Sequence, residues 1–255
     1  MPNPSQAIVD ALYSYPIKGL SPASHETVNV TPGQTLPFDR AYAIENGPGR
    51  FDPFKPQHLP KIAFLMLMRD ERLATLKTTF DPATTFLTIE RDGKQVARGQ
   101  LSTPIGRQMI EQFLAAYMQA NLRGAPRIVS AKGHSFSDVA EKCVHIVNRA
   151  SIQDFERFIG RPLDPLRFRA NIYIEGLKPW QELDWIDKTI RIGDIDLDVY
   201  KRTQRCPATN VNPQTATRDL DIPAALQRHK GHMDFGIYAK IATAGSLSKY
   251  DTVAW

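Results

Sequence analysis

The feature that most constrains the fold of this chain is a succession of short apolar segments, many of them alternating, that end at turn residues. The 255 residues include 19 prolines and 15 glycines, which interrupt the sequence too often for a bundle of long helices. Segments of about four to eight residues separated by turns are typical of small β-barrels and sandwiches. The sequence therefore predicts a β-rich α+β fold.

Strands are expected in both halves of the chain, with a few helices between them. The expected strands cover residues 9–15, 25–30, 41–44, 62–68, a hairpin of 85–91 with 94–97, 144–147, 171–175, a pair within 187–200, and 236–242. The expected helices cover residues 104–122, 151–159 and 223–229. Ser151 is the expected N-cap of the second helix and Gly160 its C′ residue. Residues 47–60 are rich in proline and glycine, which predicts a loop.

A domain boundary is expected where Gly124, Ala125 and Pro126 follow the first long helix. It divides the chain into an N-terminal domain of residues 1–123 and a C-terminal domain of residues 124–255. Because no Gly/Ser-rich linker separates these domains, we expect them to share an interface.

Composition and charge exclude several classes of partner. The net charge is +5 without a run of five or six like charges, which suits an anionic small ligand. Basic residues do not interleave with aromatic ones as in an RNA-binding sheet, so no nucleic acid is expected. No apolar stretch approaches the roughly 20 residues of a membrane helix, so no membrane partner is expected either. The absence of a signal-peptide pattern and of a disulfide framework favours the cytoplasm.

The most unusual stretch is residues 201–219, which follow an expected strand and are crowded with polar side chains. Cys206 comes directly after Arg205 and four positions after Arg202. A neighbouring cation favours thiolate over thiol, and thiolate is the form that acts as a nucleophile or as a soft-metal ligand. A buried or surface thiol without a role is the alternative for this cysteine.

Arg167 and Arg169 form a second candidate site, for an anion. Two residues apart, they point to the same face of an extended chain, and guanidinium suits bidentate phosphate binding. Surface arginines paired with Asp164 and Glu175 are the alternative interpretation.

Two shorter groups are weaker candidates. Lys18 supplies a point charge, and Gly19 would let a ligand approach the backbone closely. The pair of Asp39 and Arg40 is the other group. Taken alone, each is more typical of a turn with a solvated charge.

Together, these segments resemble the MOSC family with its preceding MOSC N-terminal β-barrel domain, over nearly the whole chain. The matching segments are YPIKG (15–19), DR (39–40), FSD (136–138), FRANI (168–172), RCPATNVNPQT (205–215), FGIY (235–238) and DTV (251–253). Asn212, Ala216 and Tyr250 depart from the usual family pattern, and none of them replaces an expected ligand.

The resemblance implies a β-barrel MOSC domain packed with a small N-terminal β-barrel-like domain. It also implies a molybdenum cofactor, Mo-molybdopterin, whose metal is bound by Cys206, with Asp138 as a catalytic group near the metal's open face. The cofactor-binding residues that it implies are Lys18, Gly19, Arg40, Arg169, Asn171, Arg205, Thr209 and Asn210.

The first functional hypothesis is a molybdenum enzyme that reduces small N-hydroxylated compounds. Its electrons would come from an external flavin or iron–sulfur donor, because the chain has no flavin motif and no cysteine cluster. The alternative is a non-catalytic protein that carries the cofactor, or carries sulfur on Cys206. A third reading is an interaction domain whose cysteine is incidental. Pyridoxal phosphate binding is a further property associated with the resemblance.

Overall fold

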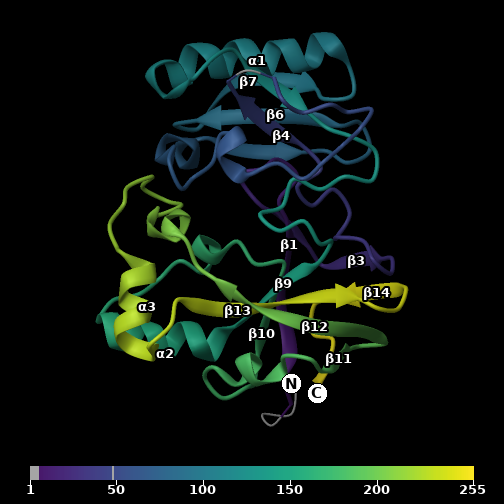
Figure 1. Cartoon of the computed structure of the whole chain (residues 1–255), viewed down its shortest axis with the longest axis vertical. Helices are drawn as coiled ribbons and strands as arrows, with labels where there is room; N and C mark the ends of the chain where they lie inside the picture. The colour runs from purple at the N-terminus through teal and green to yellow at the C-terminus, as the bar shows by residue number, and fades with distance from the viewer. Residues whose placement is uncertain (1–5, 48) are drawn as a thin grey trace.

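An eight-stranded sheet organises the larger part of the computed structural model, which describes residues 6–47 and 49–255. This part lies at the bottom of Figure 1. Neighbouring strands are antiparallel, except that β9 and β10 are parallel. In spatial order the strands are β15 (Val253–Ala254), β11 (Thr189–Ile192), β12 (Ile195–Gln204), β13 (Asp234–Ile241), β9 (Val144–Asn148), β10 (Ile172–Glu175), β1 (Ile8–Ser14) and β2 (Ala23–His25).

The smaller part, at the top of Figure 1, contains two short sheets covered by the helix α1 (Pro104–Met118). Thr103 caps α1 by accepting a hydrogen bond from the Gly106 amide, and Ile110, Leu114 and Met118 face its core. Gly99 lets α1 approach β7, because a Cβ there would lie 2.1 Å from the carbonyl oxygen of Gly106. The strands are β5 (Lys77–Phe80), β6 (Phe86–Arg91) and β7 (Lys94–Gln100) in one sheet, and β4 (Ala43–Asn46) and β8 (Pro126–Val129) in the other.

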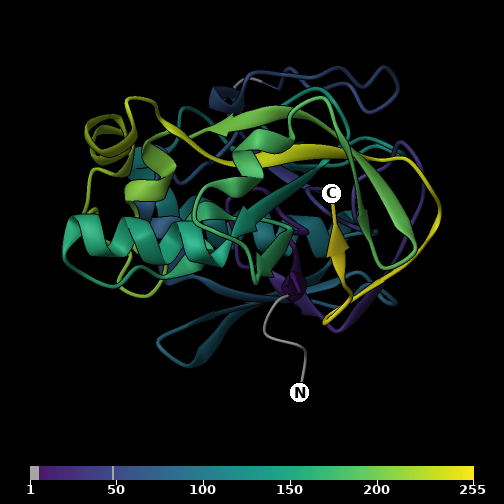
Figure 2. The ribbon, with the colours of Figure 1, turned by 90° about the horizontal axis from the view of Figure 1, so that it is seen from below.

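Two helices flank the eight-stranded sheet and lie side by side in Figure 2: α2 (Arg149–Ile159) and α3 (Ile222–Lys230). Gly160 ends α2 in the left-handed conformation, as predicted. The predicted N-cap is wrong. Asn148 caps α2 through a bond from the Ala150 amide, while Ser151 is buried and donates to Glu182.

The remaining short elements are a strand pair and several 3₁₀ turns. The pair is β3 (Thr27–Val30) with β14 (Gly245–Ser248). The turns are η1 (Lys61–Ala63), η2 (Glu71–Thr75), η3 (Gln119–Asn121), η4 (Pro165–Phe168), η5 (Gln181–Trp185) and η6 (Pro207–Asn210).

The strand predicted for residues 62–68 is wrong, and burial is limited to its centre, Phe64 to Met66. Only Phe64 bridges to a strand, opposite Glu45. The chain then turns, because the fully buried Asp70 accepts a hydrogen bond from the Met66 amide and donates its own amide to the Met66 carbonyl. The buried residues of this segment are held by side-chain packing, because the segment does not pair with a sheet over its length.

The predicted fold class is confirmed, since strands dominate both parts and helices are few. The two parts are interleaved in sequence: β1 and β2 belong to the eight-stranded sheet, and the chain enters the smaller part only afterwards. The domain boundary at residues 123–124 stays a prediction. In the region that the structure describes, no helix combines the length and apolar character needed to cross a membrane.

Candidate functional site

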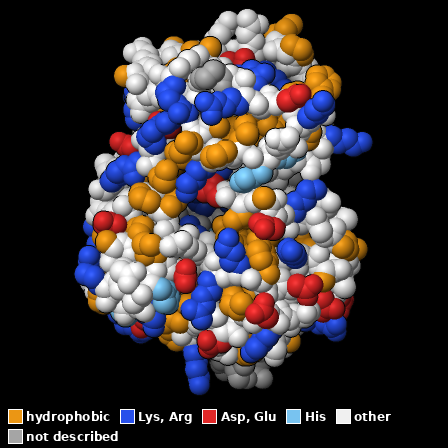
Figure 3. All heavy atoms as spheres, in the orientation of Figure 1, with side chains coloured by type: hydrophobic (Ala, Val, Ile, Leu, Met, Phe, Trp, Pro, Cys, Tyr) orange, Lys and Arg blue, Asp and Glu red, His pale blue; other side chains and the backbone are white. Residues whose placement is uncertain are grey.

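A cleft opens where the two parts meet and contains about 830 Å³ of empty space, part of it open to solvent. Figure 3 shows the hollow with charged side chains around it. Six basic and two acidic side chains line it: Lys18, Arg40, Lys61, Arg167, Arg169 and Arg205, with Asp39 and Asp138. This excess of positive charge favours an anionic ligand.

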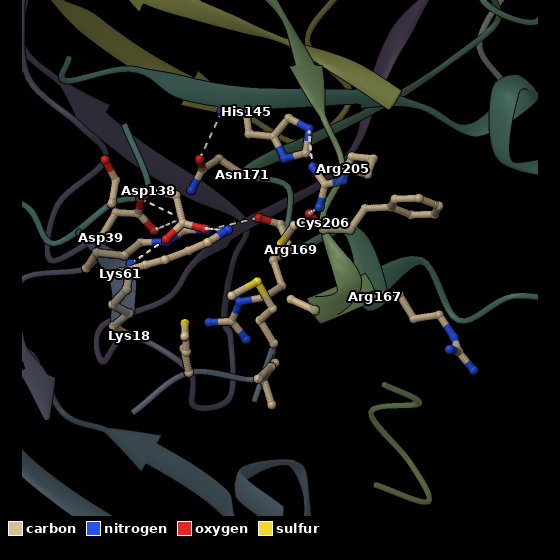
Figure 4. Close-up of a pocket in the computed structure, with 18 of the residues that line it drawn as sticks. Lys18, Asp39, Lys61, Asp138, His145, Arg167, Arg169, Asn171, Arg205 and Cys206 are labelled. Atoms are coloured by element: carbon tan, nitrogen blue, oxygen red, sulfur yellow. Dashed lines mark hydrogen bonds and ion pairs between the residues drawn. The ribbon is translucent and has the colours of Figure 1, made fainter. Parts of the chain in front are cut away.

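Cys206 reaches the cleft because the long strand β12 ends just before it. The Arg205 amide still bonds to the Met233 carbonyl, and Pro207 then begins η6. The partly exposed thiol of Cys206 lies in the wall of the cleft (Figure 4). The Cys206 carbonyl accepts bonds from the amide and hydroxyl of Thr209, at 3.1 and 2.9 Å, which hold the loop in place.

Arg205 is held beside Cys206 by its contacts with the larger part. Its Nη2 donates to the Phe168 carbonyl at 2.8 Å, and its Nη1 lies 3.4 Å from Nε2 of His145. Burial, together with the positive charge of Arg205, lowers the pKa of His145 well below its usual value, so the imidazole is neutral at pH 7. The Nε atom of Arg205 is buried and has no partner among the described residues.

Lys18 and Asp138 form an ion pair on the opposite wall (Figure 4). Lys18 is buried and also donates to the Phe136 carbonyl at 2.8 Å. The side chain of Asp138 is 46% exposed, and its second oxygen lies 3.8 Å from Nζ of Lys61. Desolvation raises the pKa of Asp138, but attraction to Lys18 and then Lys61 outweighs it, and the pKa falls to about 2. Asp138 is therefore ionised at neutral pH and is no proton donor in this state.

Two further arginines are fixed around the buried ring of Tyr15. The guanidinium carbons of Arg40 and Arg169 lie 4.3 and 4.2 Å from the ring centroid, within the range of a cation–π contact. Asp39 holds Arg40 through contacts of 2.5 and 2.6 Å and accepts a bond from the Tyr15 amide. Desolvation is the main cause that lowers the pKa of Arg169 to about 10, so it remains charged at pH 7.

Asn171 and Gly19 also line the cleft. The amide side chain of Asn171 bonds to the His145 backbone N–H and to the Tyr13 carbonyl, which joins β9 to β1. Gly19 has a φ of +85°, a conformation that few other residues adopt, and it is a buried part of the cleft wall.

Three residues singled out from the sequence are placed differently. Thr209 and Asn210 do not line the cleft. Thr209 supports the Cys206 loop, and Asn210 accepts a bond from the Ile222 amide. Arg167 touches the cleft wall, but its guanidinium points away from Cys206 (Figure 4) and pairs with Asp219 at 2.6 Å. The alternative interpretation, a surface arginine paired with Asp164 or Glu175, is wrong for Arg167, because its side chain is buried and pairs with Asp219.

His145 and Lys61 line the site, and reasoning from the sequence did not single them out, because each lies in an ordinary strand or turn pattern with no spacing that marks it. Tyr15 and Phe168 also shape the site. They stand in the matching segments 15–19 and 168–172, but no role was predicted for them from the sequence. His145 reaches the cleft because β9 pairs with β13. Lys61 reaches it because the segment 61–68 returns to the cleft wall.

The fold and the cleft together define a β-rich protein in two parts, with one partly exposed thiol in a cationic cleft between them. The model of the MOSC domain matches residues 131–254, and that of the MOSC N-terminal beta barrel domain matches residues 6–125. The chain belongs to the MOSC family.

Curated relatives include much longer proteins named molybdenum cofactor sulfurase. The one from Drosophila willistoni is 35% identical over 112 residues, which are 43% of this chain and 14% of that protein. The one from Caenorhabditis briggsae is 25% identical over 240 residues, which are 90% of this chain and 33% of that protein. The chain thus spans only between about one seventh and one third of these relatives. A solved structure, the YuaD protein of Bacillus subtilis, aligns with 98% of this chain and 97% of its own at 12% identity and a TM-score of 0.44.

Proposed function

We propose that the cleft binds a molybdenum–pterin cofactor, Mo-molybdopterin, with Cys206 as the protein's ligand to the metal. One observation carries the proposal: the thiol of Cys206 stands in the wall of a cleft in which basic side chains outnumber acidic ones even without Arg167, which pairs with Asp219. A soft thiolate suits a redox metal, and the basic groups suit the phosphate of the pterin.

The donors in the cleft fit such a ligand. Of the three guanidinium nitrogens of Arg169, Nη1 donates to the Leu20 carbonyl. The other two, Nε and Nη2, have no partner among the described residues and can bind a ligand. The orphaned Nε of Arg205 is a further donor close to Cys206. Across residues 6–47 and 49–255, no group of three His, Cys, Asp or Glu side chains could hold a metal ion. A metal at Cys206 would therefore take its other ligands from the cofactor.

The proposed reaction is the reduction of N-hydroxylated compounds such as amidoximes. The N–O bond breaks, two electrons and two protons are consumed, and an amidine and water leave. The bound cofactor would supply the two-electron oxygen-atom chemistry. Arg169, Arg40 and Lys18 would hold its phosphate and edges, and Arg205 would adjust the charge around the thiolate. The electrons would come from an external flavin or iron–sulfur protein, because the chain has only two cysteines.

A carrier of the cofactor, or of sulfur on Cys206, is the second candidate. The names of the curated relatives favour it, since they are molybdenum cofactor sulfurases. Pyridoxal phosphate binding, another implication of the family resemblance, stays a prediction.

Protein produced in a host that supplies the cofactor tests these proposals. We expect molybdenum and pterin in about equal amounts, and conversion of benzamidoxime to benzamidine when a reduced dye replaces the electron donor. Loaded protein that forms no benzamidine would contradict the reductase proposal. A persulfide on Cys206 without metal, detected by mass spectrometry, would favour sulfur carriage.

Asp138 is expected to compete with an anionic ligand for Lys18 and Lys61. Asp138→Asn removes the internal counter-ion, so the affinity of the cofactor-free protein for inorganic phosphate should rise by about three- to tenfold. Isothermal titration calorimetry measures this affinity. Asp92→Asn, the same change of charge on an exposed hairpin, is the control and should leave the affinity unchanged. Unchanged or weaker phosphate binding by Asp138→Asn would show that Asp138 does not occupy the anion site.

A further inference from the structure

A second cavity adjoins the Cys206 cleft and contains about 1020 Å³ of empty space, part of it open to solvent. It lies between the two parts, on the side of β5 and the loop that follows Cys206. The two cavities share five wall residues: Gly19, Leu67, Arg167, Arg169 and Ala208. These five residues form a common wall between the two cavities, and Cys206 lines only the first of them.

The walls of this cavity differ in character from those of the Cys206 cleft. Aliphatic side chains from both parts of the molecule face it: Leu20, Leu73, Leu76, Leu166 and Val211. Such walls favour an uncharged organic group through burial of apolar surface.

The rim of the cavity is tied together by bonds between the two parts. Ser21 and Thr78 exchange two hydrogen bonds, of 3.3 and 3.0 Å, between their amides and hydroxyls. Lys77 donates to the Pro213 carbonyl at 2.6 Å, which joins β5 to the cysteine loop. The cavity is therefore a defined feature of the docked parts rather than a loose gap.

The shared wall contributes two arginines, and further polar side chains stand elsewhere in the lining, among them Ser21, Lys77, Thr78, Thr79 and Gln214. The Nε atom of Arg167 is buried and has no partner in the described part of the chain. Arg169 offers the donors described above. An occupant with an apolar body and a polar, hydrogen-bond-accepting end would match both ends of the cavity.

We propose that this second cavity holds the apolar body of the substrate, with the N-hydroxyl end directed to the shared wall and Cys206. The inference rests on the proposed reductase function and narrows it. The substrates are N-hydroxylated compounds that carry a hydrophobic ring, and small hydroxylamines make no use of the cavity.

Filling the cavity tests this assignment. Ala74 lines the second cavity only and is partly buried, so Ala74→Phe places a ring inside it. Thr79→Phe, at an exposed position of the same lining, is a second variant in case the first does not fold. Ala83→Phe, in the exposed turn between β5 and β6, is the matched control.

With reduced dye as donor, the KM for benzamidoxime should rise by about tenfold or more in the two cavity variants, while the KM for hydroxylamine changes by less than about twofold. Saturation-transfer NMR of benzamidoxime with cofactor-free protein gives a second readout, and the signal should disappear in the variants. Molybdenum and pterin contents should stay unchanged.

Equal effects on both substrates, or no effect on either, would overturn the assignment. A loss of pterin and molybdenum in the variants would also overturn it, because the cavity would then hold the cofactor. If loaded wild-type protein reduces neither substrate but binds benzamidoxime in a way that the variants block, the reductase function fails and the cavity assignment stands.

Discussion

Cys206→Ser is expected to remove one sulfur ligand from the bound metal and to lower amidoxime reduction by more than about a hundredfold. A neutral serine hydroxyl is a weaker electron donor than a thiolate, so it changes the charge and the electronic properties of the metal even where it coordinates. X-ray absorption at the molybdenum edge counts the sulfur ligands, and elemental analysis of the same samples gives the metal content. The spectroscopic readout separates loss of a ligand from general loss of activity.

Cys143→Ser is the matched control, because Cys143 lines the same cleft and is the only other cysteine of the sequence. Burial raises the pKa of the Cys143 thiol to about 11, so it stays protonated at neutral pH and is a poor metal ligand. We expect the number of sulfur ligands to be unchanged in this variant. An unchanged metal site in Cys206→Ser, or a lost ligand in Cys143→Ser, would refute the assignment of Cys206.

Asp39→Ala is expected to lower the free energy of unfolding by about 3–5 kcal/mol, because it leaves the charge of Arg40 buried without its partner. The side chain of Asp39 is only 2% exposed and that of Arg40 is 14% exposed. The substitution also removes the acceptor for the Tyr15 amide. Urea denaturation of the cofactor-free protein, followed by tryptophan fluorescence, measures the change.

An exposed ion pair gives the comparison for Asp39. Arg191 and Asp196 lie 2.7 Å apart on the hairpin of β11 and β12, where solvent screens their attraction. Asp196→Ala should therefore leave stability nearly unchanged. Similar losses in the two variants would mean that the Asp39–Arg40 pair contributes no more than a surface pair.

The separate segments of the site could be predicted because each has a local chemical signature. Cys206 follows an arginine at the end of a strand pattern, and Lys18, Arg40 and Arg169 stand in short motifs at turns. The structure places these residues around one cleft, drawn from positions nearly 190 residues apart. That these residues bind a cofactor is the proposal made above.

Thr209 and Asn210 show where a motif stops being informative. Both lie in the cysteine motif, yet their side chains bond to the Cys206 carbonyl and the Ile222 amide instead of facing the cleft. The direction of a side chain depends on the turn that η6 makes after Pro207. The order of residue types in the motif does not determine which side chains point into the cleft.

By itself, the sequence determined the β-rich class, most strands and helices, the Cys206 loop and the surplus of basic residues. These follow from patterns a few residues long, in which alternation, capping and turn chemistry act locally. Only the tertiary structure decided that Asp138 neutralises Lys18, that two arginines pack on the ring of Tyr15, and that a second cavity adjoins the Cys206 cleft. Such contacts depend on how the two parts dock, because hydrogen bonds, ion pairs and cavities form between atoms that are close in space, whatever their distance along the chain.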